Sequence, residues 1–280
     1  MEIITSTQNS KIKRLNLLEQ KSAARRESKL FVVEGKRELM HCVKAGYEVD
    51  SVYFCPDITG PIADGTSNKA GIEEPTAGML IGSLPDTCER IAVSKQLYEK
   101  IAYRGGTEGV KALVRERHTT LSELKLQDNP LIVVLEGVEK PGNLGAVLRS
   151  ADASGADAII VCDPLTDLYN PNLIRSSIGA IFNVPCVACS SEECIDFLKT
   201  KKIQILTAQL QDSKLYYDTP MTSGTAIVMG TEASGLTPQW RKAADAHIRI
   251  PMLGKLDSLN VSVSAAILLF EAVRQRSINA

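Results

Sequence analysis

Three glycine-containing loops carry most of the residues that could do chemistry in this chain. They read EGVEKPGNLGAVLRSADASG at 136–155, MGTEASGL at 229–236 and IPMLGKLDSLN at 250–260. Each loop follows or continues an apolar run typical of a strand, and ligands in open α/β sheets bind beyond the carboxyl ends of the strands. The arrangement therefore predicts one ligand site that all three loops share.

Neither of the familiar nucleotide motifs occurs in these loops. The first loop reads PGNLGAVLRS, which lacks both the G-x-G-x-x-G fingerprint and the Gly-Lys-Ser/Thr ending of a P-loop. The third loop differs in another way. Its polar stretch from Gly254 to Asn260 lies between an apolar strand end and an apolar helix predicted from about Leu259 to Arg276. A loop that only connects is usually more polar and more charged, so this one is predicted to be held for binding.

A basic segment near the start of the chain could bind phosphates. Residues 11–30 carry seven Lys or Arg against two Glu, although the formal net charge of the chain is −1. A local basic surface can bind nucleic acid without a basic isoelectric point. Residues 11–27 read as an amphipathic helix, with Ile12, Leu15 and Leu18 on its apolar side. The basic residues can equally be the solvated face of this helix, and composition leaves both interpretations open.

The elements that must position these residues alternate between strand and helix. Residues 1–115 read as a small α/β domain, with an exposed excursion rich in Gly, Pro, Asp and Thr at 57–78. Residues 116–129 read as a linker. In residues 130–280, continuous apolar runs such as LIVVLEGV at 131–138 alternate with helical patterns. This alternation predicts a second α/β domain with a parallel sheet.

The composition is typical of a soluble globular protein, with 44% hydrophobic and 23% charged residues. No run of 18 apolar residues occurs and the first residues lack an apolar signal core, so neither a membrane span nor secretion is expected. Seven scattered cysteines favour reduced thiols and a cytoplasmic protein. The pair Cys186 and Cys189 has no second pair, Cys194 is not at a zinc-finger spacing and His247 is isolated. We therefore expect buried thiols and no metal.

The three loops together resemble the motifs of SPOUT-class methyltransferases, in particular the SpoU or TrmH family of RNA 2′-O-ribose methyltransferases. The matching segments are PGNLGAVLRSADASGADAIIV, VMGTEASGL and IPMLGKLDSLNVSVSAAILLFE, in family order over 130–276. Residues 1–115 resemble the accessory substrate-binding domain of the family, which is similar in fold to a small RNA-binding ribosomal protein. The excursion at 57–78 and the residues Lys255 to Asp257 depart from the family pattern.

The resemblance implies a fold and a cofactor. In this class the C-terminal segment threads through a loop to make a deep trefoil knot, whose walls bind S-adenosylmethionine. Knots are otherwise nearly absent from proteins, so periodicity does not predict one. The implied cofactor-binding residues are Thr207, Ala208, Gly230, Ile250, Met252, Leu259 and Asn260.

The resemblance also implies a catalytic set led by Arg149. The family proposal is that this arginine, helped by the RNA phosphate, activates the ribose hydroxyl. A free guanidinium has a pKa above about 12 and is a poor base. We therefore expect Arg149 to stabilise the developing alkoxide and to clamp the phosphate. The rest of the implied set consists of Asn143, Glu232, Ser258 and Asn260. Each has an open alternative role. Asn143 can be a turn residue, Glu232 a solvated carboxylate, and Ser258 and Asn260 helix caps.

The predicted partners are structured RNA and a second copy of the chain. The residues expected to bind RNA are Lys11, Lys13, Arg14, Arg25, Arg26 and Arg175. Ribosomal RNA is the first expected substrate and transfer RNA the second. The family is usually a homodimer packed through its knotted domains. A non-catalytic RNA-binding or ribosome-assembly factor that retains the fold is the main alternative, and an unrelated nucleotide-binding enzyme is disfavoured by the missing motifs.

Overall fold

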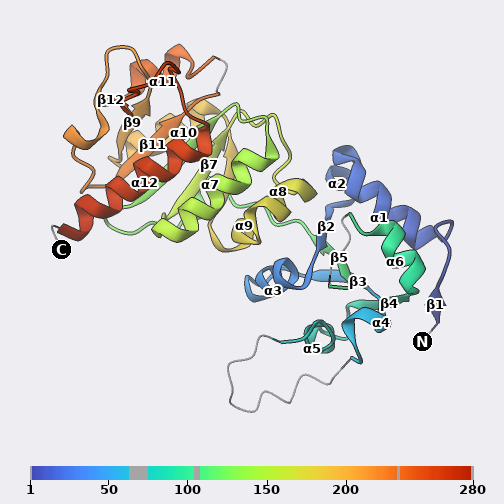
Figure 1. Cartoon of the computed structure of the whole chain (residues 1–280). Helices are drawn as coiled ribbons and strands as arrows, with labels where there is room; N and C mark the ends of the chain where they lie inside the picture. Colours follow the sequence, from blue (N-terminus) through green and yellow to red (C-terminus); the bar gives the residue numbers. More distant parts are fainter. Residues whose placement is uncertain (1, 63–74, 104–107, 232–233, 279–280) are drawn as a thin grey trace. The chain divides into compact units, whose positions relative to one another are not determined.

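The computed structural model describes residues 2–62, 75–103, 108–231 and 234–278 (Figure 1). The chain forms two compact units, made of Met1–Arg117 with Tyr169–Gly179 and of His118–Leu168 with Ala180–Ala280. This division differs from the predicted domain ranges, because Tyr169–Gly179 groups with the first unit and residues 118–129 group with the second. Most of the predicted excursion, residues 63–74, lies outside the described residues.

The first unit contains a mixed five-stranded sheet in the order β1-β4-β3-β5-β2. Strand β4 pairs in parallel with β1 and β3, whereas β5 runs antiparallel to β3 and β2. The strands are β1 (Ile3–Ile4), β2 (Leu30–Glu34), β3 (Val49–Phe54), β4 (Glu89–Val93) and β5 (Val110–Arg115). The helices are α1 (Ser10–Gln20), α2 (Ser22–Ser28), α3 (Lys36–Lys44), α4 (Pro56–Thr59), α5 (Ala77–Ser83), α6 (Lys95–Ile101) and α8 (Pro171–Ser177).

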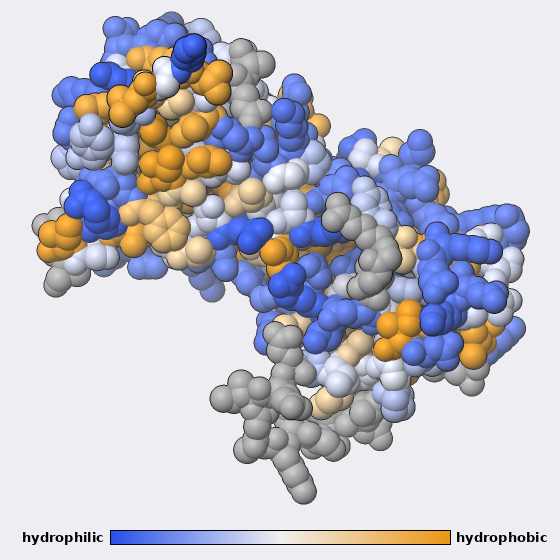
Figure 2. Space-filling view, in the orientation of Figure 1, coloured by the Kyte–Doolittle hydropathy of each residue, from blue (hydrophilic) through white to orange (hydrophobic). Residues whose placement is uncertain are grey.

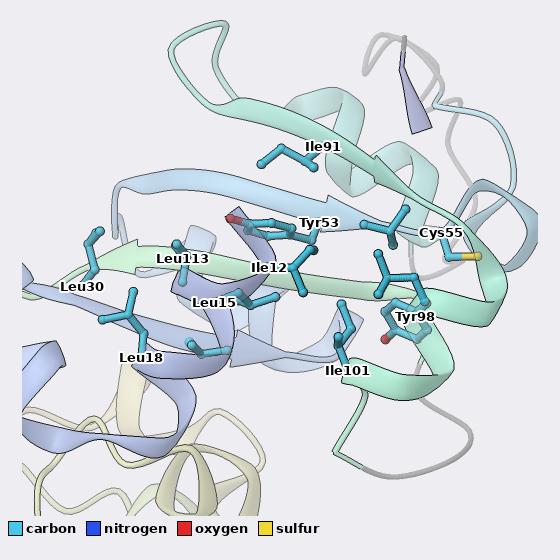
Figure 3. Close-up of a cluster of buried hydrophobic side chains, with 13 residues drawn as sticks. Ile12, Leu15, Leu18, Leu30, Tyr53, Cys55, Ile91, Tyr98, Ile101 and Leu113 are labelled. Atoms are coloured by element: carbon cyan, nitrogen blue, oxygen red, sulfur yellow. The ribbon is translucent and has the colours of Figure 1, made fainter. Parts of the chain in front are cut away.

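One face of this sheet is covered by α1 and α6 (Figure 3). Ile12, Leu15 and Leu18 are buried there, as the amphipathic pattern predicts. The predicted single helix over 11–27 is wrong in one respect, because Lys21 adopts an extended backbone and divides it into α1 and α2.

The second unit contains a seven-stranded sheet in the order β10-β12-β9-β11-β6-β7-β8, and every pairing is parallel. The strands are β6 (Leu131–Glu136), β7 (Ala158–Cys162), β8 (Cys186–Cys189), β9 (Gln204–Ala208), β10 (Lys214–Leu215), β11 (Thr225–Met229) and β12 (Ala246–Arg249). The helices are α7 (Pro141–Ser154), α9 (Ala180–Asn183), α10 (Ser191–Thr200), α11 (Pro238–Ala243) and α12 (Val261–Ile278), with the short 3-10 turns η1 (Leu121–Glu123) and η2 (Tyr216–Asp218).

Helices cover both faces of this parallel sheet, which explains its continuous apolar strands. Side chains that alternate along β6, such as Ile132 and Val134, pack with residues of α10 and α11 in one cluster. Their neighbours Val133 and Leu135 are fully buried as well. Helix α12 packs along α7 (Figure 1). The predicted parallel α/β sheet is confirmed, and the three loops follow the carboxyl ends of β6, β11 and β12. Among the described residues, none of the helices has the length and apolar character needed to span a bilayer.

Candidate functional site

A cleft of about 380 Å³ opens in the second unit where β9, β11 and β12 end. The predicted cofactor residues that line it are Ala208, Gly230, Ile250, Met252 and Leu259. Ligand pockets typically enclose roughly 300–1,000 Å³, so this volume suits one small organic ligand. The fold thus brings Ala208 and Leu259 to one cleft although they are far apart in sequence, because parallel strands end at the same edge of a sheet.

The charged residues that line the cleft indicate which kind of ligand it can bind. Arg241, Arg249 and Asp257 line the cleft together with its apolar walls. The guanidinium of Arg249 also donates to the backbone carbonyl of Ser213, which fixes its position. Apolar walls suit a purine ring, and groups of both signs suit the ammonium and carboxylate of an amino-acid tail. The chemistry of this set therefore fits S-adenosylmethionine.

Gly230 follows β11 and is needed for a close backbone contact. A Cβ atom at this position would lie 2.3 Å from the carbonyl carbon and oxygen of Gly235 and 2.6 Å from the nitrogen of Leu236. Such distances are well inside van der Waals contact, so only glycine fits. Gly230 lines the first cleft, and the missing side chain also lets the loop fold back on itself.

The loop after Gly230 is closed by its own polar groups. The amide of Gly235 donates to the carbonyl of Thr231 at 2.9 Å, and the amide of Ser234 donates to the Thr231 hydroxyl at 3.1 Å. Gly235 has a φ of +67°, a value that favours glycine. The predicted catalytic residue Glu232 lies outside the described residues.

A second cleft of about 630 Å³ adjoins the first and shares Gly230 and Thr231 as a common wall. Asn143, from the first turn of α7, lines this second cleft. The side-chain amide of Asn260 donates to the Oδ1 atom of Asn143 at 3.2 Å, which joins the first and third loops. The two clefts are thus adjacent spaces. The first is lined by predicted cofactor residues and by the predicted catalytic residue Ser258, and the second by the predicted catalytic residue Asn143.

Asn260 and Ser258 differ in what they contact. The Oδ1 atom of Asn260 accepts from the amide of Ser262 at 3.0 Å, and its carbonyl accepts from two amides of the first turn of α12. Asn260 is therefore a helix cap as well as a partner of Asn143. Ser258 lines the first cleft and is exposed, and its hydroxyl donates to Asp257 at 3.3 Å.

Arg149 lies on α7 and is exposed to solvent. It lines neither cleft, and no hydrogen bond or ion pair joins its guanidinium to another residue that the structure describes. Asn143 and Arg149 are six residues apart on one helix, so they project from different sides of it. The guanidinium of Arg149 is thus available to an external anion such as a phosphate.

Thr207, which was expected to bind the cofactor, is placed behind the cleft. It is fully buried and forms a 2.6 Å hydrogen bond with Nδ1 of His247. Because side chains alternate along a strand, its neighbour Ala208 lines the cleft whereas Thr207 does not. Thr207 therefore orients β12 rather than a ligand.

One carboxylate near the clefts was missed by sequence reasoning. Glu136, at the end of β6, is 5% exposed and lines the second cleft. Its oxygens accept from the Thr237 amide at 2.8 Å, from the Thr237 hydroxyl at 2.6 Å and from the Ser191 hydroxyl at 3.3 Å. Trp240 donates to Ser191 at 3.0 Å, which extends the network. The sequence does contain a sign of this role, because Glu136 is the one charged residue in the apolar run Leu131–Glu136. A charge buried at the end of such a strand needs polar partners.

The basic face of α1 and α2 contains most of the predicted RNA-binding residues. Lys13, Arg14 and Arg26 are exposed. Lys11 is exposed too, although its ammonium pairs with Glu89. These side chains extend from one pair of short helices, so the first unit presents a local cationic surface.

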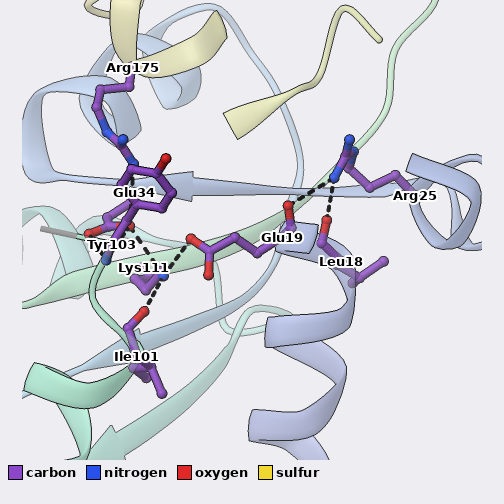
Figure 4. A network of polar contacts seen from close by, with 8 residues as sticks. All are labelled: Leu18, Glu19, Arg25, Glu34, Ile101, Tyr103, Lys111 and Arg175. Carbon is purple, nitrogen blue, oxygen red and sulfur yellow. Dashed lines mark hydrogen bonds and ion pairs between the residues drawn. The ribbon is translucent and has the colours of Figure 1, made fainter. Parts of the chain in front are cut away.

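Arg25 does not belong to this surface. It is 2% exposed, and its guanidinium donates to the carbonyl of Leu18 at 2.6 Å and to that of Glu19 at 3.2 Å (Figure 4). These carbonyls belong to the last turn of α1, whose acceptors lack helical partners. In this structure the Arg25 side chain caps a helix and is not part of the exposed basic face.

Arg175 is also engaged within the first unit. Its guanidinium lies 3.8 Å from the ring centroid of Tyr103 and 3.9 Å from a carboxylate oxygen of Glu34 (Figure 4). Glu34 in turn is 3.2 Å from the fully buried ammonium of Lys111, which also bonds Glu19 at 2.8 Å. Arg175 thus compensates a buried carboxylate, and an RNA contact would compete with that role.

Comparison with known proteins gives two family matches. Residues 130–270 match the model of the SpoU rRNA Methylase family, and residues 9–112 match the MRM3-like substrate binding domain. These ranges correspond to the parallel-sheet unit and to the unit that carries the basic face.

Individual relatives agree with these matches. The 23S rRNA (guanosine-2′-O-)-methyltransferase RlmB of Escherichia coli is 40% identical over 151 residues, which cover 54% of this chain and 62% of that protein. A crystal structure of an RNA 2′-O ribose methyltransferase superposes with a TM-score of 0.82 at 37% identity, covering 99% of this chain and 100% of that one. The SpoU methyltransferase AviRb from Streptomyces viridochromogenes, solved in complex with AdoMet, has a TM-score of 0.83 at 27% identity, covering 96% and 99% of the two chains.

Proposed function

Because the chain belongs to the SpoU rRNA methylase family, we propose that it transfers a methyl group from S-adenosylmethionine to a ribose 2′-hydroxyl of structured RNA. The observation that carries the proposal is the cleft at the ends of β9, β11 and β12, whose apolar walls and charged groups suit this cofactor. Ribosomal RNA is the proposed substrate class, supported by the named activity of the E. coli relative. The trefoil knot expected from the resemblance belongs to the proposal, with residues 250–260 as the wall of the cleft.

We assign the cofactor to the first cleft. Leu259, Ile250 and Met252 contact the adenosine, and the charged groups of Arg241 and Asp257 bind the amino-acid tail. When bound, S-adenosylmethionine supplies a methyl group attached to a positively charged sulfur. The loop closed by Gly230 then separates this cleft from the neighbouring one, where the reacting ribose enters.

The chain contributes positioning and charge stabilisation to the reaction. Asn143 lines the second cleft and is held by Asn260, so its amide can orient the ribose. Arg149 lacks a partner among the described residues, so its guanidinium can clamp the phosphate next to that ribose. The resemblance also gives Arg149 the task of stabilising the negative oxygen that forms as the 2′-hydroxyl loses its proton. Because Arg149 lines neither cleft, this role requires its guanidinium to turn toward the bound RNA. Glu232 keeps its proposed place in the catalytic set.

The basic face of the first unit is the proposed RNA contact outside the clefts. Lys11, Lys13, Arg14 and Arg26 are the side chains involved. A second copy of the chain is the proposed protein partner. Hydrophobic side chains are exposed along α12 (Figure 2), including Val263 and Phe270 at 47% and 48% exposure. These positions are seven residues apart and so share one side of the helix, as expected for a helix that packs against a partner.

The decisive test is methyl transfer from labelled S-adenosylmethionine to ribosomal RNA that lacks its own modifications. We expect alkali-resistant label at one ribose. Arg149→Ala should reduce kcat roughly 100- to 1,000-fold, the usual loss when a group that stabilises an oxyanion is removed. The dissociation constant of the cofactor, measured by calorimetry, should not change.

Lys199→Ala is the control. Lys199 is an exposed cation on α10 of the same unit, away from both clefts and from α12. It should retain full activity. Cofactor binding without methyl transfer to any RNA would favour a non-catalytic RNA-binding factor. Label on transfer RNA alone would make transfer RNA, not ribosomal RNA, the substrate. Equal activity of Arg149→Ala and the wild type would refute the role of this arginine.

A further inference from the structure

Three cysteine thiols converge in the second unit, apart from the residues that line the two clefts. Cys162 ends β7, Cys189 ends β8 and Cys194 lies in α10. Strands β7 and β8 pair so that Cys162 and Cys189 are register partners. The three sulfur atoms all lie within 4.8 Å of one another. Three elements thus direct three soft donor atoms to one point.

We propose that this cluster binds a thiophilic metal ion that prefers three ligands, the class to which Cu(I) belongs. Thiolates select soft ions such as Cu(I) over hard ions such as Mg²⁺. A structural Zn²⁺ site takes four protein ligands, and the group formed by the described residues offers three. A metal at this cluster differs from the sequence-based expectation of buried thiols and no metal.

The surroundings of the cluster suit a metal site with an entry path. Cys162 and Cys194 are fully buried, whereas Cys189 is partly exposed. An ion can therefore reach the cluster at Cys189 and be shielded at the other two thiols. Cys189 directly precedes Ser190, the N-cap of α10, and helix N-termini favour negative charge. Glu193 is bonded to Ser190 instead of facing an ion, with its carboxylate oxygen 2.8 Å from the Ser190 amide.

The binding step involves no electron transfer. Each thiol loses its proton to solvent and forms one sulfur–metal bond, so binding of Cu(I) releases up to three protons and leaves the oxidation state unchanged. Affinity should consequently fall as the pH is lowered, because protons compete with the metal for each sulfur.

The test uses the full chain, fully reduced and kept under anaerobic conditions. Cu(I) is titrated alone against a competing Cu(I) chelator, and thiolate-to-metal charge-transfer absorption is recorded. We expect one Cu(I) per chain. Loss of an outer-shell partner typically weakens metal binding roughly 10- to 100-fold. We expect a larger loss of Cu(I) affinity when a ligand itself is removed, in each of the variants Cys189→Ser, Cys162→Ser and Cys194→Ser.

Cys186→Ser is the matched control, since Cys186 lies on the same strand as Cys189 but outside the cluster. It should bind Cu(I) like the wild type. Circular dichroism establishes that each variant folds, and Cys189→Ser is the most informative because its thiol is the least buried of the three. Unchanged binding in Cys189→Ser, equal loss in Cys186→Ser, or tight binding of Zn²⁺ alone with none of Cu(I) would each overturn the proposal.

Discussion

At the scale of single residues, small differences in position decide which side chains serve the clefts. Ala208 lines the first cleft, while Thr207 beside it is buried against His247. Arg149 is exposed and Arg25 is not, although both are arginines on helices next to predicted binding surfaces. The role of each residue follows from the direction of its side chain and from the partners it meets.

Gly230→Ala should weaken cofactor binding. The added Cβ would lie 2.3 Å from the carbonyl group of Gly235, so the loop must move away from β11. Forcing an extra methyl group into a packed site costs about 1–3 kcal/mol. We expect the cofactor affinity, measured by calorimetry, to fall roughly tenfold or more.

Gly142→Ala is the control for this prediction. A Cβ at Gly142 meets no atom within 4 Å, and the residue lies in the first turn of α7. It should leave the cofactor affinity unchanged. Equal affinities of the wild type and Gly230→Ala would show that the loop does not form the wall of the cofactor cleft.

At the scale of elements, helix ends hold the site together. Helix α7 begins with Pro141 at its first position and ends at Gly155 in a left-handed conformation, which suits both residues. Helix α12 begins at Val261 and is capped by Asn260, which also bonds Asn143 of α7. Asn143 in the first turn of α7 lines the second cleft, and Val261 at the start of α12 lines both clefts.

Asn260→Ala should destabilise α12. The change removes the side-chain acceptor of the Ser262 amide and the donor to Asn143. Loss of such a cap typically costs about 1 kcal/mol in the free energy of unfolding, which chemical denaturation can measure. Asn129→Ala is the control, because the exposed Asn129 uses its carbonyl but not its side chain to bond Arg276. Identical unfolding free energies of the two variants would contradict the capping role.

The double variant Lys13→Glu with Arg14→Glu should bind RNA less tightly and with a weaker salt dependence. Both side chains are exposed on α1. Each phosphate contact that is lost reduces the slope of log K against log salt concentration by about 0.7–0.9. Binding to structured RNA should be measured at several salt concentrations.

Lys199→Glu with Lys201→Glu gives the same change in charge on exposed residues at the end of α10. This control should alter RNA affinity much less. If both double variants lose affinity equally, binding depends on the net charge of the chain, and the basic face of α1 has no special role.

At the scale of the whole molecule, the chain combines a unit with a mixed sheet and a unit with a parallel sheet. The second unit exposes apolar residues on α12 and in the loop before it, with Leu253 at 98% and Leu256 at 76% exposure. Exposed apolar patches of this kind usually mark interfaces. This surface is the basis for the proposed dimer.

Phe270→Glu should convert the proposed dimer to a monomer. Phe270 is 48% exposed on α12, and a buried unpaired carboxylate at an interface is strongly unfavourable. Sedimentation at several concentrations would measure the change in mass. Ile3→Glu, at an exposed apolar residue of the first unit, should leave the mass unchanged. A wild-type chain that is monomeric at all concentrations would remove the dimer from the proposal.

The sequence by itself determined the parts of this protein that depend on local pattern. Continuous apolar runs predicted the parallel sheet, because strands buried on both faces must be apolar throughout. The position of the three loops after strands predicted that their residues lie near one another, because parallel strands end at one edge. Ile12, Leu15 and Leu18 were assigned to the core from their helical spacing, which depends only on neighbouring residues.

Only the tertiary structure decided which distant side chains meet. Tyr169 stacks on Phe31 with ring centroids 4.2 Å apart, which brings a segment from the middle of the chain into the first unit. The thiol of Cys189 joins Cys162 and Cys194 rather than the nearby Cys186. Such contacts depend on the pairing of strands and on the packing of helices over long sequence separations. No local pattern encodes that information, so these features became visible only in the folded chain.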